Sequence, residues 1–159
     1  MKQVLLIFGS IVEAKTISDI LMWTEHYHKQ LATSFNRCAN PADQQRISML
    51  IVYLEEHEEN LATALDTILE LQDEEVLNDW CSEYTLKQPL FSKHIRLDDL
   101  SKLTTEEISV KVITAHQQII AMYRGLMELA DRPKISEVLH DLIELEESEL
   151  TRTVMNTHH

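Results

Sequence analysis

Apolar residues recur at spacings of three and four along four long segments of the chain, with polar residues between them. This spacing places the apolar side chains on one face of a helix, so each segment is predicted to form an amphipathic α-helix. The four segments are about 16–39, 43–71, 105–130 and 133–154. A shorter helix is predicted within 74–83, between the second and third long segments.

Short connections with helix-breaking and capping residues separate the helices at 40–43 and 131–134, so each flanking pair of helices is predicted to form an antiparallel hairpin. The longer stretch 72–104 is long enough to cross the full length of a bundle. We therefore predict an all-α fold, an antiparallel four-helix bundle with a long crossover between its second and third helices. Its parts are an N-terminal arm (1–15), the bundle (16–154, with hairpin 16–71, crossover 72–104 and hairpin 105–154) and a tail (155–159).

Composition supports the helical prediction. The 159 residues include only 2 Gly and 3 Pro, too few for the turns of a many-stranded sheet. The net charge is −13, from 14 Lys and Arg against 27 Asp and Glu. Because nucleic-acid binding requires clustered basic residues, this charge argues against a nucleic-acid partner. It favours cations, a protein partner on the acidic face, or a second copy of the chain.

The chain shows no targeting signal that we recognise. Its apolar run Val4–Phe8 is far too short to span a bilayer and is followed by no small-residue cleavage site, so we expect no membrane partner. Cys38 and Cys81 form no CxxC pattern and indicate a reducing compartment. We expect a cytoplasmic protein, and the apolar arm favours a homodimer.

An internal repeat relates the two hairpins. Sliding the sequence against itself by 88 residues aligns 16–63 with 104–151 without a gap, and 13 of the 48 aligned pairs are identical. Unrelated sequence of this composition would give about 3. Shared helical periodicity explains matched Leu and Ile, but it does not explain matched polar residues such as His28 with His116. The repeat therefore favours a duplicated hairpin over two independent amphipathic hairpins.

Four polar side chains interrupt the apolar stripes, one on each long helix. The repeat pairs the two histidines with each other and the two glutamates with each other, which places all four toward the middle of the bundle interior. A buried carboxylate is costly unless it is paired or binds a metal. Imidazole and carboxylate together suit Fe, Mn or Zn, and helical bundles build such sites from facing helices. The four candidate metal ligands are His28, Glu58, His116 and Glu146.

Three further residues are weaker candidate ligands. Glu25 lies one turn before His28, His57 borders the stripe of its helix, and Glu149 lies three residues after Glu146. Each of the three is aligned by the repeat with an apolar residue. The residues also leave a metal-free interpretation open, in which histidines and glutamates form a hydrogen-bonded layer that only fixes helix register.

The repeat and the helix order resemble the ferritin-like superfamily, in particular its rubrerythrin-type members, over about 16–71 and 105–154. The resemblance implies a bundle of two repeated hairpins joined by a long crossover. It also implies a di-iron site that takes a Glu from each of the first and third helices and a Glu-x-x-His from each of the other two.

Carried onto this chain, the motif is incomplete. The Glu-x-x-His of the second helix falls on Glu58, with Leu61 in the His position, and that of the fourth helix falls on Glu146, with Glu149 in the His position. No catalytic residue is assigned, and oxidoreductase activity stays an open question.

In the first and third helices, the family Glu usually precedes an aromatic residue by seven positions. That register falls on His28, seven before Phe35, and on His116, seven before Tyr123. A register set instead by the distance to the Glu of the second helix would select Glu25.

Two functions follow as hypotheses. In the first, the chain is a ferritin-like bundle that binds a divalent transition metal in its core for metal handling or redox chemistry. In the second, it is a metal-free ferritin-like bundle that acts as an interaction or scaffold protein.

Overall fold

The computed structural model describes residues 16–38, 45–78 and 104–157, with the side chains of 34–38, 45–48, Ile51, Thr105 and 156–157 left out of the description. The predicted arm 1–15, most of the crossover and the side chain of Phe35 thus lie outside the described residues. The described helices are α1 (Ile17–Cys38), α2 (Gln45–Leu71), α3 (Glu74–Leu77), α5 (Thr105–Leu129) and α6 (Pro133–Thr157).

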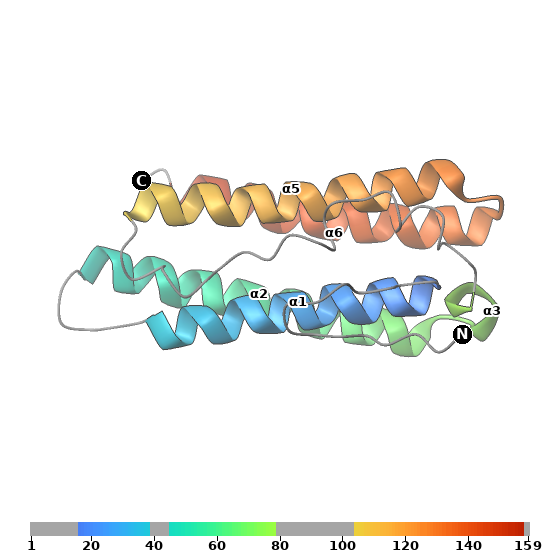
Figure 1. Cartoon of the computed structure of the whole chain (residues 1–159), viewed down its shortest axis with the longest axis horizontal. Coiled ribbons are helices and arrows are strands. Elements are labelled where there is room, and N and C mark those ends of the chain that lie inside the picture. The colour runs from blue at the N-terminus through green and yellow to red at the C-terminus, as the bar shows by residue number, and fades with distance from the viewer. Residues whose placement is uncertain (1–15, 39–44, 79–103, 158–159) are drawn as a thin grey trace, which may run out of the picture.

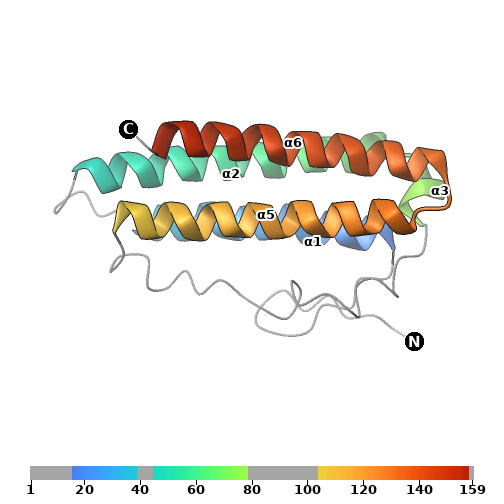
Figure 2. The same cartoon turned by 90° about the horizontal axis from the view of Figure 1, so that it is seen from above.

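The four long helices form a bundle of two antiparallel hairpins, α1 with α2 and α5 with α6, which lie side by side (Figure 1). Seen from above, α5 lies over α1, and α6 lies over α2 (Figure 2). The end of α2 and the start of α5 lie at opposite ends of the bundle (Figures 1 and 2). The connection between the hairpins must therefore span the length of the bundle, as the sequence predicts. The all-α four-helix bundle is confirmed.

Helices α1 and α5 begin in the same way. The Thr104 hydroxyl accepts a hydrogen bond from the backbone N–H of Glu107, whose carboxylate accepts one from the N–H of Thr104. Thr16 and Asp19 make the equivalent exchange at the start of α1. Such reciprocal bonds satisfy backbone donors that the first turn of a helix leaves without partners. The two pairs are separated by the 88 residues of the sequence repeat.

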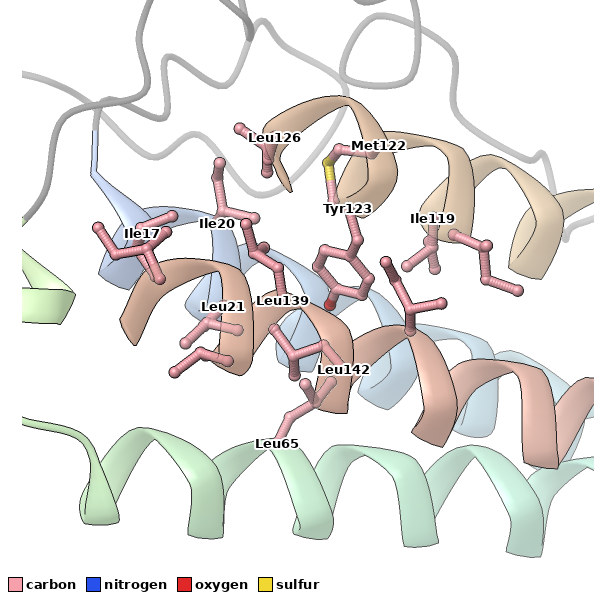
Figure 3. Packing of buried hydrophobic residues seen from close by; sticks show 14 of the residues in the cluster. Ile17, Ile20, Leu21, Leu65, Ile119, Met122, Tyr123, Leu126, Leu139 and Leu142 are labelled. Atoms are coloured by element: carbon pink, nitrogen blue, oxygen red, sulfur yellow. The ribbon is translucent and has the colours of Figure 1, made fainter. Parts of the chain in front are cut away.

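The core of the bundle is built from the apolar stripes of all four long helices. Tyr123 of α5 is fully buried and packs with Leu139 and Leu142 of α6 and with Leu65 of α2 (Figure 3). Burying one side chain of this size removes enough apolar surface from water to contribute about 1.5–3 kcal/mol. The stripe positions predicted from the spacing therefore hold the hairpins together.

The short helix α3 closes the end of the bundle where α1 begins (Figure 1). Its Val76 is buried in the core, and Glu75 accepts a hydrogen bond from Arg132, in the turn before α6, at 2.8 Å. The helix predicted within 74–83 ends at Leu77, because Asn78 leaves the helical conformation as its C-cap, and 79–83 lies outside the described residues.

Helix α6 continues to Thr157, three residues beyond the end predicted at Val154. No Gly or Pro follows Val154, so nothing in the local sequence stops the helix there. The predicted tail therefore begins as helix. Among the described helices, none is both long and apolar enough to cross a membrane.

Candidate metal centre

The four side chains predicted as metal ligands meet in the middle of the bundle. One comes from near the centre of each long helix, and each side chain is at most 2% exposed. Buried apolar residues such as Leu54, Leu142 and Ile119 continue the stripes on either side. We call this group the His–Glu ring, and its members are His28 (α1), Glu58 (α2), His116 (α5) and Glu146 (α6).

Each histidine of the ring lies between two carboxylates. His28 Nδ1 contacts Glu58, and His28 Nε2 lies 2.7 Å from a Glu146 oxygen. His116 repeats the pattern, with Nδ1 at 2.8 Å from Glu146 and Nε2 at 2.6 Å from Glu58. Every one of these contacts has a counterpart 88 residues away, so the ring has the two-fold arrangement that the sequence repeat implies.

This geometry favours one protonation state of the ring, with both histidines charged. Because a carboxylate oxygen only accepts hydrogen bonds, a histidine that bonds carboxylates through both nitrogens donates from both and is an imidazolium. Burial alone would lower the pKa of His28, but Glu146 and Glu58 outweigh burial and raise the pKa from 6.5 to about 9. The pKa of His116 is raised well above 6.5 by Glu58 and Glu146 in the same way, against burial.

The pKa values of the two carboxylates shift in the opposite direction. Burial alone would raise the pKa of Glu58, but His116 and His28 outweigh it and lower the pKa from 4.5 to about 2. The pKa of Glu146 is likewise lowered to about 2 by His28 and His116, against burial. Two imidazolium and two carboxylate groups make the ring neutral as a whole, which is what allows four ionised groups to be buried together.

The two imidazole rings are stacked, with centroids 5.2 Å apart and planes at 27°. Two positive charges at this separation repel each other in a medium of low dielectric constant. The alternation of positive and negative groups around the ring offsets the repulsion. The nitrogens of both histidines are thereby held beside carboxylate oxygens.

A single cation could reach three of the four members directly. One nitrogen each of His28 and His116 and one oxygen of Glu146 all lie within 4.8 Å of one another. Ligand atoms bound at 2.0–2.2 Å to one metal lie about 3–4 Å apart, so a small contraction suffices. Glu58 contacts the other nitrogen of each histidine, so it would orient the two imidazoles from the far side of such a site.

The weaker candidates do not join the ring. Glu25 instead pairs with Lys29, one turn later on α1, at 2.6 Å. His57 of α2 and Glu149 of α6 form a separate pair, with Nδ1 of His57 2.5 Å from Oε2 of Glu149. Arg152 donates to the other oxygen of Glu149 at 3.1 Å.

Tyr27 borders the ring, a contact that the sequence pattern did not predict. Tyr27 packs edge-on to the His28 ring at 6.1 Å and stacks on Trp23 at 5.2 Å. Burial, and then the negative charges of Glu58 and Glu146, raise the pKa of Tyr27. The signal for this contact in the sequence is that Tyr27 adjoins His28.

A second group of ligand-type side chains lies on the exposed face of α6, where His140, Asp141 and Glu144 come close together. The nitrogens of His140 lie 3.8–4.0 Å from the two carboxylates. These residues are solvated, unlike the ring. The spacing of His140 and Glu144, four residues apart on a helix, was the signal for it in the sequence.

The fold has a solved counterpart. A Thermotoga maritima protein, provisionally described as a ferritin-like diiron-carboxylate protein, superposes with a TM-score of 0.62, covering 90% of this chain and 95% of that chain at 12% sequence identity. No family model matches the sequence, and no curated protein matches it. The comparison shows that this chain has the ferritin-like fold.

Proposed function

We propose that this chain is a ferritin-like bundle that binds one divalent transition metal at the His–Glu ring. The single observation that carries the proposal is the burial of two imidazoles and two carboxylates, one from each long helix, in contact with one another. Nitrogen and oxygen donors in this mixture suit Fe, Mn or Zn. The diiron-carboxylate description of the Thermotoga maritima protein supports the proposal that the bound species is a metal ion.

The residues of the ring fit a divalent cation in charge as well as in donor type. With neutral imidazoles, Glu58 and Glu146 give the ring two negative charges, which a divalent cation would neutralise. In the structure the same two charges are neutralised by the imidazolium groups of His28 and His116. A metal bound there would supply a Lewis-acidic or redox-active centre. The surrounding apolar residues would exclude water from it.

The ring contains two carboxylates, and Leu61 and Glu149 stand where the family places histidines. Three donors within reach of one another, from His28, His116 and Glu146, suit one metal ion better than a pair of metal ions, which needs bridging and terminal carboxylates. We therefore propose a single-metal site.

One observation favours a second candidate function. Every member of the ring is already hydrogen-bonded to two others, so the bundle is complete without a metal. The ring could then serve as a polar layer that fixes helix register, in a scaffold or interaction protein whose contact surface is the acidic exterior.

The two functions are separated by equilibrium dialysis of the untagged protein against Zn²⁺, Mn²⁺ and Fe²⁺ under anaerobic conditions, followed by elemental analysis. The metal-site proposal predicts about one ion per chain, and loss of that ion in the Glu146→Gln variant. Glu144→Gln, on the exposed face of the same helix, is the matched control and should retain the metal. Wild-type protein that retains none of the three metals would leave the scaffold function as the better account.

A further inference from the structure

The His57–Glu149 pair is more exposed than the His–Glu ring and neighbours two members of the ring in sequence. His57 precedes Glu58 on α2, and Glu149 follows Glu146 by one turn on α6, so the pair and the ring share two helices. The side chains of His57 and Glu149 are 18% and 11% exposed, whereas those of the ring are at most 2% exposed. The side chains of the pair are therefore partly exposed, whereas those of the ring are buried.

The sequence repeat shows that the fold does not require a polar pair at this place. Under the 88-residue offset, His57 corresponds to Leu145, and Glu149 corresponds to Leu61. All four residues lie on α2 and α6, so the two helices carry one polar pair and one apolar pair at equivalent positions. Burying a polar pair costs desolvation free energy that two leucines avoid. The polar pair thus calls for a reason other than packing.

The surroundings of the pair hold the donors in place and limit how tightly they would bind a cation. The Tyr53 ring lies 4.1 Å from the His57 ring, which restricts the imidazole. Arg152 donates to Glu149 at 3.1 Å, and its positive charge opposes a cation at the same carboxylate. Two protein donors beside a fixed positive charge make a weak site that releases its ion readily.

We propose that His57 and Glu149 form an outer cation site, through which a divalent metal ion reaches the buried His–Glu ring. This inference rests on the proposed metal-binding function, since it assigns the route by which the ring is loaded. The ion is held by one imidazole nitrogen, one carboxylate oxygen and water. It then passes between α2 and α6 to Glu58 and Glu146, the nearest ring members on those helices.

The test is the rate of Zn²⁺ uptake by the metal-free full chain, followed as the colour change of a chromophoric chelator that gives up its zinc. The variant His57→Leu/Glu149→Leu copies the apolar pair Leu61 and Leu145 and should preserve packing. We expect it to bind the same amount of Zn²⁺ at equilibrium as the wild type, at a rate at least about tenfold lower. Glu149→Gln, which keeps the size of the side chain, should slow uptake in the same direction if the double variant folds poorly.

The matched control is His140→Leu/Glu144→Leu, which removes a histidine and a glutamate from the exposed face of α6. It should load at the wild-type rate. Equal rates for the wild type and both outer-site variants would overturn the proposal, as would equal slowing by the control, which would indicate general attraction by the acidic surface. If the wild type binds no Zn²⁺ at all, the proposed metal site fails, and that outcome is distinct from a change in rate alone.

Discussion

At the scale of single residues, the His–Glu ring pairs groups of opposite charge that could not be buried alone. An isolated ionised carboxylate in a protein interior loses its hydration without compensation. For Glu58, contacts with His28 and His116 compensate for the lost hydration. Contacts with the same two histidines do so for Glu146. Each ring member therefore depends on two others.

The first prediction concerns the loss of one carboxylate. In metal-free protein at pH 6, Glu58→Gln leaves His28 and His116 with one negative charge between them, so the free energy of unfolding should fall by about 3–5 kcal/mol. Glu56→Gln, on the exposed face of α2, should change it by less than about 0.5 kcal/mol. Urea denaturation measures both. Equal, small changes in the two variants would show that ion pairing within the ring does not stabilise the fold.

A second prediction is the pH dependence of stability. Because the pKa of His28 is raised from 6.5 to about 9, its contribution is complete below pH 6.5 and is lost as the pH rises through about 9. Because the pKa values of Glu58 and Glu146 are lowered from 4.5 to about 2, their contribution is complete above pH 4.5 and is lost as the pH falls through about 2. The ring should therefore stabilise the fold most between pH 4.5 and 6.5.

The measurement is the urea midpoint from pH 4.5 to 9.5, compared with a variant that has Leu at all four ring positions. The difference between wild type and variant should shrink steadily above pH 6.5. A difference that stays constant up to pH 9.5 would mean that the histidines are not imidazolium groups in the fold.

At the scale of elements, the helices follow directly from the periodicity of the sequence. The spacing of apolar residues predicts α1, α2, α5 and α6 to within three residues at each end, because burial of the stripe dominates helix formation. The end of α6 is the largest difference, since a helix without a stop signal continues as far as its backbone can bond. Helix ends depend on local caps more than on the stripe.

The capping exchange at the start of α5 gives a third prediction. Thr104→Ala removes the hydroxyl that accepts from the Glu107 N–H, and it should lower the free energy of unfolding by about 1 kcal/mol. Thr114→Ala, at an exposed position inside the same helix, should not destabilise, because Ala is the better helix former. Thermal unfolding of the two variants checks this, and equal loss in both would contradict the capping role.

At the scale of the whole molecule, the repeat predicted which residues meet, and the bundle geometry determines how. The 88-residue offset pairs His28 with His116 and Glu58 with Glu146, which anticipates a symmetric site. Periodicity alone does not give the rotation of α2 against α6, so it did not anticipate that His57 bonds Glu149. That contact joins residues 92 positions apart and depends on the register between hairpins.

Binding of a metal ion should also stabilise the whole bundle, because a ligand that binds only the folded state adds to its stability. With Zn²⁺ at 100 times its dissociation constant, the free energy of unfolding should rise by about 2.7 kcal/mol. The variant with Leu at all four ring positions should show no such rise. A Zn²⁺-dependent rise of equal size in that variant would place the metal outside the ring.

The most direct test of the account is the number of protons released when Zn²⁺ binds to the metal-free protein. Isothermal titration calorimetry at pH 6, in buffers of different ionisation enthalpy, measures it. Because each imidazolium of the ring must give up one proton to offer a nitrogen, we predict release of about two protons per ion bound. Binding without proton release, or no binding, would contradict a metal site at His28 and His116.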